Sequence, residues 1–205
     1  MWLVERDREL SVAQGLVEVT RAGTGGLLVI EGPSGIGKSA LLGELAGRAA
    51  AGALAVRSVR ATPLGAEVPF ALARWLLEPA VHAVPSALEA GWARHARSLF
   101  DGEVGGPGDQ RLLVEGLVAL VAELRRAGGP LALIVDDVQW SDPASLEFLG
   151  ELAVRCEDLG VAVAVAIGTG QGQVDGRSLH RLASAAGPRL LQPAPLSADA
   201  VRALV

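Results

Sequence analysis

Two continuous aliphatic runs stand out along the chain, at residues 131–135 and 161–167. Neither run alternates with polar residues, which is typical of central strands that helices cover on both faces. A third apolar run, at residues 27–30, lies between glycines, and weaker strand patterns cover 53–59 and 189–192. Together these runs predict a buried parallel sheet of five strands.

Helical periodicity fills most of the chain between these runs. It is clearest over residues 109–127, where the leucine and valine side chains fall on one face. Further helical patterns cover 5–20, 39–51, 142–153, 177–186 and the residues after Ser197. Residues 69–100 are mostly helical, with breaks expected near Pro79 and Pro85, and the glycine-rich segment 101–108 is predicted to be a surface loop. This alternation of strands and helices predicts an α/β domain.

Composition and charge exclude several kinds of function. The 205 residues are 50% hydrophobic and 3% aromatic, which suits one domain with an aliphatic core. The net charge of -5 repels phosphate backbones, so we expect this segment not to bind nucleic acid. No apolar stretch approaches the ~18 residues of a membrane span, so we expect a cytoplasmic protein without membrane contact. The histidines form no metal-ligand pattern, and the single cysteine, Cys156, is expected to be inert packing on a helix.

A phosphate-binding motif follows the first strand and opens a helix. The pattern is GxxxxGKS, and its lysine is the only one in the chain, so a chance match is improbable. In such a loop, glycines let main-chain N–H groups surround a β-phosphate, Lys38 reaches the β and γ oxygens, and the Ser39 hydroxyl ligates Mg²⁺. The predicted ATP or ADP contacts are Gly32, Pro33, Ser34, Gly35, Ile36, Gly37, Lys38, Ser39 and Ala40.

A pair of aspartates ends the predicted strand at 131–135. A P-loop needs an acidic residue at the end of a buried strand to hold Mg²⁺, and Asp136 occupies that place. Asp137 is then placed to act as the general base on the attacking water, and we assign catalytic roles to Asp137 and Lys38. The alternative for Asp137 is a helix or turn cap.

The spacing of the two motifs predicts how their strands are arranged. Roughly a hundred residues separate the loop from Asp136, which leaves room for a βα unit. The strand at 161–167 is therefore expected to lie between the two motif strands. Thr169, just after it, would face the γ-phosphate, where a polar residue can sense hydrolysis; a plain turn is the equal alternative.

The residues quoted so far resemble the STAND-type ATPase domain of large LuxR-family (MalT-like, LAL) transcriptional regulators. The resemblance covers nearly the whole chain. It is carried by the opening LVERDREL at 3–10, the loop at 32–39, the segment LIVDDVQWSD at 133–142 and Pro195-Leu196-Ser197 followed by Ala200. Within the third segment, Trp140 is expected to be core and Asp142 to cap the next helix.

The resemblance implies a three-layer α/β/α P-loop NTPase with a five-stranded sheet ordered 5-1-4-3-2. It also implies that adenine is held near Val4, Arg6 and Pro195; a solvated charge on the first helix is the alternative for Arg6. The implied role is a regulatory switch in which nucleotide controls self-association of a long protein with a DNA-binding helix-turn-helix.

Two departures from the family qualify this expectation. The family shows an arginine after the fourth strand where this chain has Gly170. Residues 1–205 are expected to be a single nucleotide-binding domain of a longer protein, without the helical lid, the repeats and the helix-turn-helix. Because Asp137 is one methylene shorter than the usual glutamate, we expect slow ATP hydrolysis.

Two other classes share the same loop. An AAA+-like remodelling ATPase would have the same fold and acidic strand end, and would complete its sites with an arginine finger from a neighbour. A small-molecule kinase would need a lid carrying arginines, for which Arg94 and Arg97 are the candidates.

Overall fold

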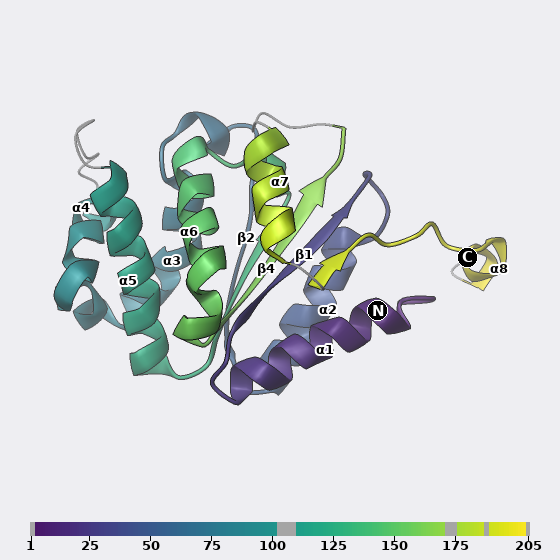
Figure 1. Cartoon of the computed structure of the whole chain (residues 1–205), viewed down its shortest axis with the longest axis horizontal. Coiled ribbons are helices and arrows are strands. Elements are labelled where there is room, and N and C mark those ends of the chain that lie inside the picture. Colours follow the sequence, from purple (N-terminus) through teal and green to yellow (C-terminus); the bar gives the residue numbers. More distant parts are fainter. Residues whose placement is uncertain (1–2, 102–109, 171–175, 187–188, 204–205) are drawn as a thin grey trace.

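The computed structural model describes residues 3–101, 110–170, 176–186 and 189–203. Its single sheet contains β1 (Gly26–Gly32), β2 (Ala55–Arg60), β3 (Leu131–Asp136), β4 (Val161–Gly168) and β5 (Leu190–Leu191). All pairs of neighbouring strands are parallel, and the order is β2-β3-β4-β1-β5 (Figure 1). This is the predicted order 5-1-4-3-2, and β4 lies between the two motif strands as the spacing indicated.

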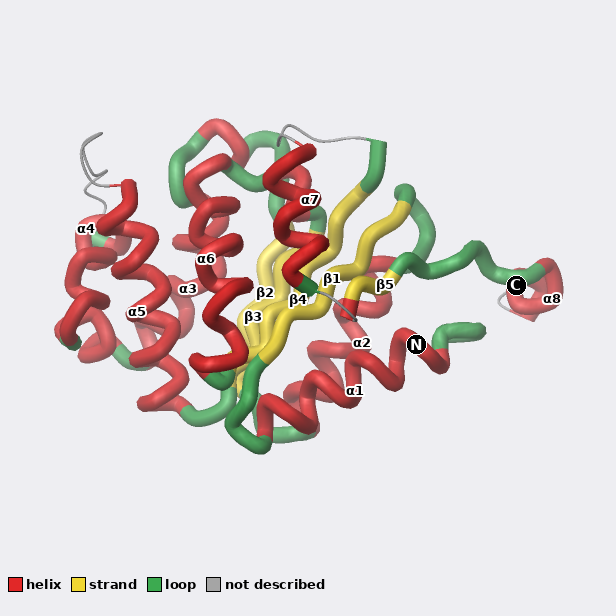
Figure 2. Tube along the Cα trace, viewed as in Figure 1, coloured by secondary structure: helices red, strands yellow, loops and turns green. Residues whose placement is uncertain are grey.

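Helices cover both faces of the sheet, so the fold has three layers (Figure 2). The helices are α1 (Asp7–Arg21), α2 (Lys38–Ala51), α3 (Ala71–Ala83), α4 (Arg97–Phe100), α5 (Gln110–Gly128), α6 (Pro143–Leu159), α7 (Gly176–Ala185) and α8 (Ala198–Ala203). Helices α1 and α2 pack on one face, whereas α3, α5, α6 and α7 share a hydrophobic cluster on the other. The predicted α/β/α architecture is confirmed.

Four short 3-10 helices complete the described structure. They are η1 (Gly65–Glu67), η2 (Pro85–Glu89), η3 (Gly91–Ala96) and η4 (Val138–Trp140). In the described chain no helix is both long and apolar enough to cross a membrane.

The two faces of β4 explain why its sequence is continuously apolar. Val161, Val163 and Val165 belong to the cluster beneath α5 and α6. Ala162 and Ala164, on the opposite face, belong to the cluster beneath α1 and α2. Successive side chains of a strand point to opposite faces, so a strand covered on both sides is apolar at every position.

The predicted break at Pro79 is wrong, because α3 continues through this residue to Ala83. The turn around it carries the buried side chains of Leu77, Ala80 and Val81. Their packing outweighs the backbone hydrogen bond that proline cannot make. The helix does end before Pro85, as expected from the restriction that proline places on the preceding residue. Of the loop predicted at 101–108, only Asp101 lies within the described residues.

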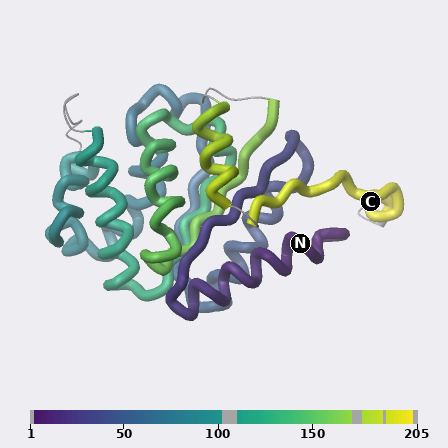
Figure 3. Tube along the Cα trace, viewed as in Figure 1, coloured from purple at the N-terminus to yellow at the C-terminus, as the bar shows by residue number. Residues whose placement is uncertain are grey.

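The beginning and the end of the described chain are joined by hydrogen bonds. The Glu5 carboxylate accepts from the main-chain N–H of Ser197 at 2.8 Å and from its hydroxyl at 2.6 Å. The same hydroxyl accepts from the N–H of Ala200 at 3.1 Å, which caps α8 as predicted. Figure 3 shows these purple and yellow segments beside the P-loop end of the sheet.

Candidate functional site

The glycine-rich loop connects β1 to α2, as the motif requires. Gly35 and Gly37 have φ angles of 81° and 102°, a region that side chains other than glycine rarely adopt. Gly37 is the N-cap of α2, and within the described chain no side chain caps this helix. The first N–H groups of α2 and the positive end of its dipole therefore remain available for an anion.

Lys38 is held over the loop by main-chain oxygens of the loop itself. Its ammonium donates to the carbonyls of Gly32 and Pro33, both at 2.9 Å, and the residue is 7% exposed. The Gly32 carbonyl also accepts from the N–H of Thr169 at 3.1 Å. The lysine and the end of β4 are thus fixed beside the same loop residue, although the described contact of Thr169 comes from its main chain.

The Asp136 carboxylate faces the loop at the carboxyl edge of the sheet, but its partner there was not predicted. Arg60, the last residue of β2, donates to one oxygen, Asp136 Oδ2, from Nε at 3.0 Å and from Nη2 at 2.5 Å. The same Nη2 donates to Ser39 Oγ at 3.1 Å. One guanidinium nitrogen therefore lies between the two residues assigned to Mg²⁺.

Strand register places Arg60 there. The parallel pairing of β2 with β3 puts Arg60 directly beside Asp136, and the carboxylate raises the pKa of the Arg60 guanidinium through a hydrogen bond and charge attraction. The apolar pattern of the second strand ends at Val59, so Arg60 was not among the predicted site residues. A charged residue at the end of a parallel strand could have been predicted to lie near Asp136, because the carboxyl ends of parallel strands meet at one edge of the sheet.

Asp137 is linked to β4 through Gln139. Asp137 has a φ of 56°, and its Oδ1 accepts from Gln139 Nε2 at 3.2 Å. The Oε1 of the same amide accepts from the N–H of Gly168 at 2.7 Å, and the glutamine is 4% exposed. Asp137 precedes η4 without a side-chain cap bond, so its carboxylate does not serve as the turn cap considered as its alternative. Sequence reasoning did not assign Gln139 a role.

The oxygens around Asp136 fit a hard divalent cation. Ser39 Oγ and Asp136 Oδ2 already share one cationic nitrogen. The second oxygen, Asp136 Oδ1, is buried and has no hydrogen-bond partner in the described chain. The described residues contain no cluster of three His, Cys, Asp or Glu side chains that could hold a metal. Such a site suits Mg²⁺ bound through one or two protein oxygens plus phosphates and water.

Arg6 joins the loop to the segment near the C-terminus. It is 5% exposed, and its Nη2 donates to the carbonyls of Ala194 at 2.9 Å and Ile36 at 3.4 Å. The alternative of a solvated charge for Arg6 is therefore wrong. The neighbours of these residues, the half-buried Val4 and the exposed Pro195, are the other positions assigned to adenine, and their contact with a base stays a prediction.

Comparison with known proteins agrees with this geometry. The sequence profile described as AAA ATPase domain matches residues 3–165. The chain belongs to the AAA ATPase domain family. Members of this family bind nucleotide, usually with Mg²⁺, which agrees with the loop and the Asp136 carboxylate.

Solved structures share the fold of this AAA ATPase domain. Cdc6p from Pyrobaculum aerophilum matches with a TM-score of 0.62 and 17% identity over 99% of this chain and 48% of that one. The Aeropyrum pernix Orc1 protein, solved in complex with DNA, matches with a TM-score of 0.56 and 18% identity over 98% and 48%. The chain spans about half the length of each. A search of curated proteins gives no match.

Two residues of the segment 133–142, Asp142 and Trp140, have structural roles in the AAA ATPase domain. Asp142 is 1% exposed, and its Oδ1 accepts from the N–H groups of Ser145 and Phe70, each at 2.8 Å. It therefore caps α6, as predicted, and also fixes the start of α3. Trp140 packs, half-buried, against the core.

Burial raises the pKa of the Cys156 thiol to about 11, so this thiol is inert at neutral pH.

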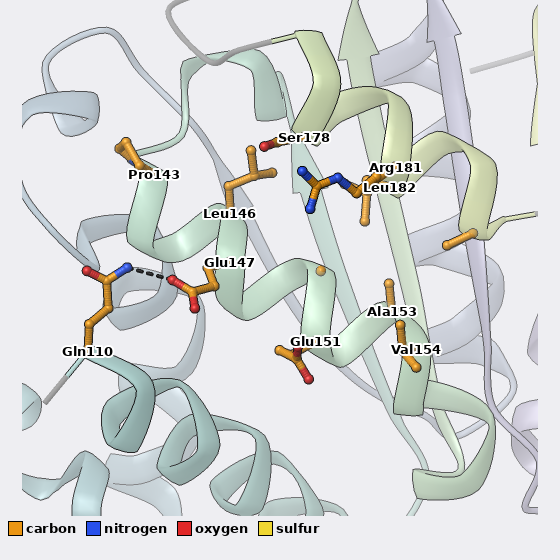
Figure 4. Close-up of a pocket in the computed structure, with 12 residues that line it drawn as sticks. Gln110, Pro143, Leu146, Glu147, Glu151, Ala153, Val154, Ser178, Arg181 and Leu182 are labelled. Atoms are coloured by element: carbon orange, nitrogen blue, oxygen red, sulfur yellow. Dashed lines mark hydrogen bonds between the residues drawn. The ribbon is translucent and has the colours of Figure 1, made fainter.

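The AAA ATPase domain also has a hollow away from the loop. A cavity of about 680 Å³ lies between α6 and α7 and reaches the start of α5 (Figure 4). Leu146, Val154 and Leu182 form part of its wall, and none of the predicted site residues lines it. Among the described residues, Arg181 is the one cationic side chain in its wall that could bind a phosphate, so we do not assign the nucleotide to this cavity.

Arg97, one of the two arginines considered for the lid of a kinase, forms an ion pair with Glu89.

Proposed function

We propose that this AAA ATPase domain binds ATP or ADP with Mg²⁺ and acts as a regulatory switch that hydrolyses ATP slowly. The observation that carries the proposal is the grouping of Lys38, Ser39 and Asp136 at one edge of the sheet, around an uncapped helix start. An ammonium, a hydroxyl, a carboxylate and free N–H groups are the set of groups that a magnesium-bound polyphosphate needs.

Each part of the site has a separate task in this proposal. The loop amides and Lys38 bind the β- and γ-phosphates, and Ser39 and Asp136 hold the cation. Bound Mg²⁺ offsets charge on the phosphate oxygens. Asp137 orients the attacking water and accepts its proton, and Thr169 lies where the end of β4 meets the loop. Val4, Arg6 and Pro195 form the adenine side.

Two features of the site support slow hydrolysis. Asp137 is one methylene shorter than the usual glutamate, so its carboxylate extends less far from the end of β3. Gly170 supplies no charge for the transferring phosphoryl group, where an arginine is worth about 10³ to 10⁵ in kcat.

We further propose that the domain belongs to a longer LuxR-family, STAND-type transcriptional regulator. The opening segment, the DDVQWSD segment and the PLS segment support this assignment. Nucleotide would then control self-association of the whole protein. The net charge of -5 supports a division of labour in which another domain contacts DNA.

A remodelling ATPase of the AAA+ type is the second candidate, favoured by the fold shared with Cdc6p and Orc1. Such machines place a neighbour's arginine at the nucleotide. Size-exclusion chromatography with and without ATP separates the two candidates. A regulatory module stays monomeric in isolation, whereas a ring-forming ATPase elutes as an oligomer when ATP is present.

The nucleotide site itself is tested by replacing its lysine. We expect Lys38→Ala to weaken ADP binding by at least about 100-fold, because a charge-assisted contact to phosphate is lost. Isothermal titration calorimetry measures this directly. Arg48→Gln is the matched control, since it removes one positive charge from the same helix at a half-buried ion pair with Glu44. Equal affinity in Lys38→Ala and the control would exclude the loop as the site.

A further inference from the structure

One guanidinium contacts every residue to which the proposed function assigns the cation and the lytic water. Arg60 Nη2 lies 2.5 Å from Asp136 Oδ2 and 3.1 Å from Ser39 Oγ, and Nε lies 3.6 Å from Asp137 Oδ2. The carboxylate of Asp136 belongs to β3 and the hydroxyl of Ser39 to the first turn of α2. The arginine therefore bridges the strand and the loop from the neighbouring strand β2.

This position cannot be shared with a metal ion. Mg²⁺ bound by these residues sits about 2.0 to 2.1 Å from an oxygen that ligates it directly, and it brings a shell of waters or phosphate oxygens. The space between Ser39 Oγ and Asp136 Oδ2 holds a cationic nitrogen instead. Steric overlap and repulsion between like charges both exclude simultaneous occupancy.

The Arg60 side chain is also free to move away from this position. Its side chain is 59% exposed, whereas that of Asp136 is 11% exposed. The guanidinium thus reaches the carboxylate from the solvent side, and rotation about its side-chain bonds frees the carboxylate without unpacking the core. Because solvent reaches the guanidinium, screening limits the strength of this half-exposed ion pair.

We propose that Arg60 competes with Mg²⁺ for the site between Ser39 and Asp136, so that Mg²⁺ binds only when this arginine moves away. The inference rests on the proposed function and adds a gate to it. Arg60 keeps the carboxylate neutralised when no cation is bound, and it raises the Mg²⁺ concentration at which the domain forms its complex with nucleotide and metal.

The gate is tested by Mg²⁺ titrations at a fixed concentration of fluorescent methylanthraniloyl-ADP. In Arg60→Ala we expect the Mg²⁺ concentration at half-saturation to fall by roughly two- to fivefold, because one ion pair screened by solvent on its arginine side is lost. Arg60→Lys keeps the positive charge but loses the forked donors of the guanidinium. We therefore expect its Mg²⁺ concentration at half-saturation to lie between the values for wild type and Arg60→Ala. Circular dichroism checks that each variant is folded.

The matched control is Arg57→Gln. Arg57 lies three residues earlier on β2, about 10 Å along the strand, and its described hydrogen bond is to the carbonyl of Val56. This variant loses the same charge and should keep the wild-type Mg²⁺ requirement. An unchanged requirement in Arg60→Ala, or a higher one, would overturn the proposal. The higher value would show that Arg60 assists the bound complex.

A second measurement separates this inference from the nucleotide proposal. In the NMR spectrum of arginine side chains, we expect the Nε–H group of Arg60 to be protected from exchange in wild type and unprotected in Asp136→Asn. Mg²⁺ added without nucleotide should remove the protection in wild type at high enough concentration. If protection persists at saturating Mg²⁺, the competition is refuted. If wild type binds no nucleotide but the protection responds to Mg²⁺, only the nucleotide proposal fails.

Discussion

At the scale of single residues, the site combines groups that are close in sequence with groups that meet only in the fold. Spacing was enough to predict that Lys38 and Ser39 belong to one loop and that Asp136 ends a buried strand. It was not enough for Arg60 and Gln139. Arg60 reaches Asp136 through the register of β2 and β3, and the Gln139 side chain connects the ends of β3 and β4. Contacts across strands depend on strand order and register, which local patterns do not contain.

Gln139 gives a prediction about turnover. We expect Gln139→Ala to lower the rate of ATP hydrolysis about tenfold, because Asp137 loses the amide that orients it. ADP affinity should change by less than about threefold, since the glutamine does not belong to the phosphate loop. Steady-state phosphate release and calorimetry measure the two quantities.

Gln110→Ala is the control for this substitution. It removes another glutamine whose amide donates to a carboxylate, that of the α6 residue Glu147. Equal turnover in Gln139→Ala and wild type would show that Asp137 needs no such support, or takes no part in hydrolysis.

At the scale of elements, hydrophobic periodicity predicted the strands and most helices, while single polar residues determine how the helices join. Asp142 is the clearest case. The sequence indicated a cap on α6, but the same carboxylate also accepts from the N–H of Phe70 at the start of α3, 72 residues away. Phe70 has a φ of 59°, so the backbone there depends on support from outside the helix.

We expect Asp142→Ala to destabilise the domain by about 3 kcal/mol, because the buried N–H groups of Phe70, Leu72 and Ser145 lose their acceptor. Urea denaturation followed by circular dichroism gives this free energy of unfolding. Asp199→Ala, which removes an exposed aspartate paired with Arg202 on α8, should cost less than about 0.5 kcal/mol. A loss for Asp142→Ala as small as that of the control would contradict the double role.

The contact between Glu5 and Ser197 makes a prediction about pH. Two hydrogen bonds lower the pKa of Glu5 in the folded chain. The larger effect comes from the hydroxyl of Ser197 and the smaller from its N–H group. The unfolded glutamate has a pKa of about 4.3, so in acid the unfolded chain binds more protons. The stabilisation is therefore fully present above about pH 4.3 and is lost as pH falls through the lower folded value.

Thermal unfolding of wild type and Glu5→Gln between about pH 3 and pH 7 tests this contribution. Wild type should be the more stable near neutrality, and the difference should shrink in acid. Glu9→Gln, which removes a carboxylate from the adjacent helix α1, is the control for the loss of one negative charge. A constant difference across the range would assign the effect of Glu5 to something other than its charge.

At the scale of the whole molecule, the three-layer fold and its strand order brought the motif residues to one edge. Continuous aliphatic strands, a loop between a strand and a helix, and the distance between the two motifs predicted a parallel sheet with β4 between the motif strands. The full strand order was implied by the resemblance to STAND-type ATPases. The break at Pro79 was predicted wrongly, because burial of the surrounding turn overrides the local cost of proline.

The most direct test of the central claim is a crystal structure of the domain with ADP and Mg²⁺. The account predicts the diphosphate within the loop from Gly32 to Ser39, with the metal between Ser39 and Asp136 and the guanidinium of Arg60 moved out of that position. A nucleotide bound elsewhere, or Arg60 still bridging Ser39 and Asp136 beside a bound metal, would contradict it.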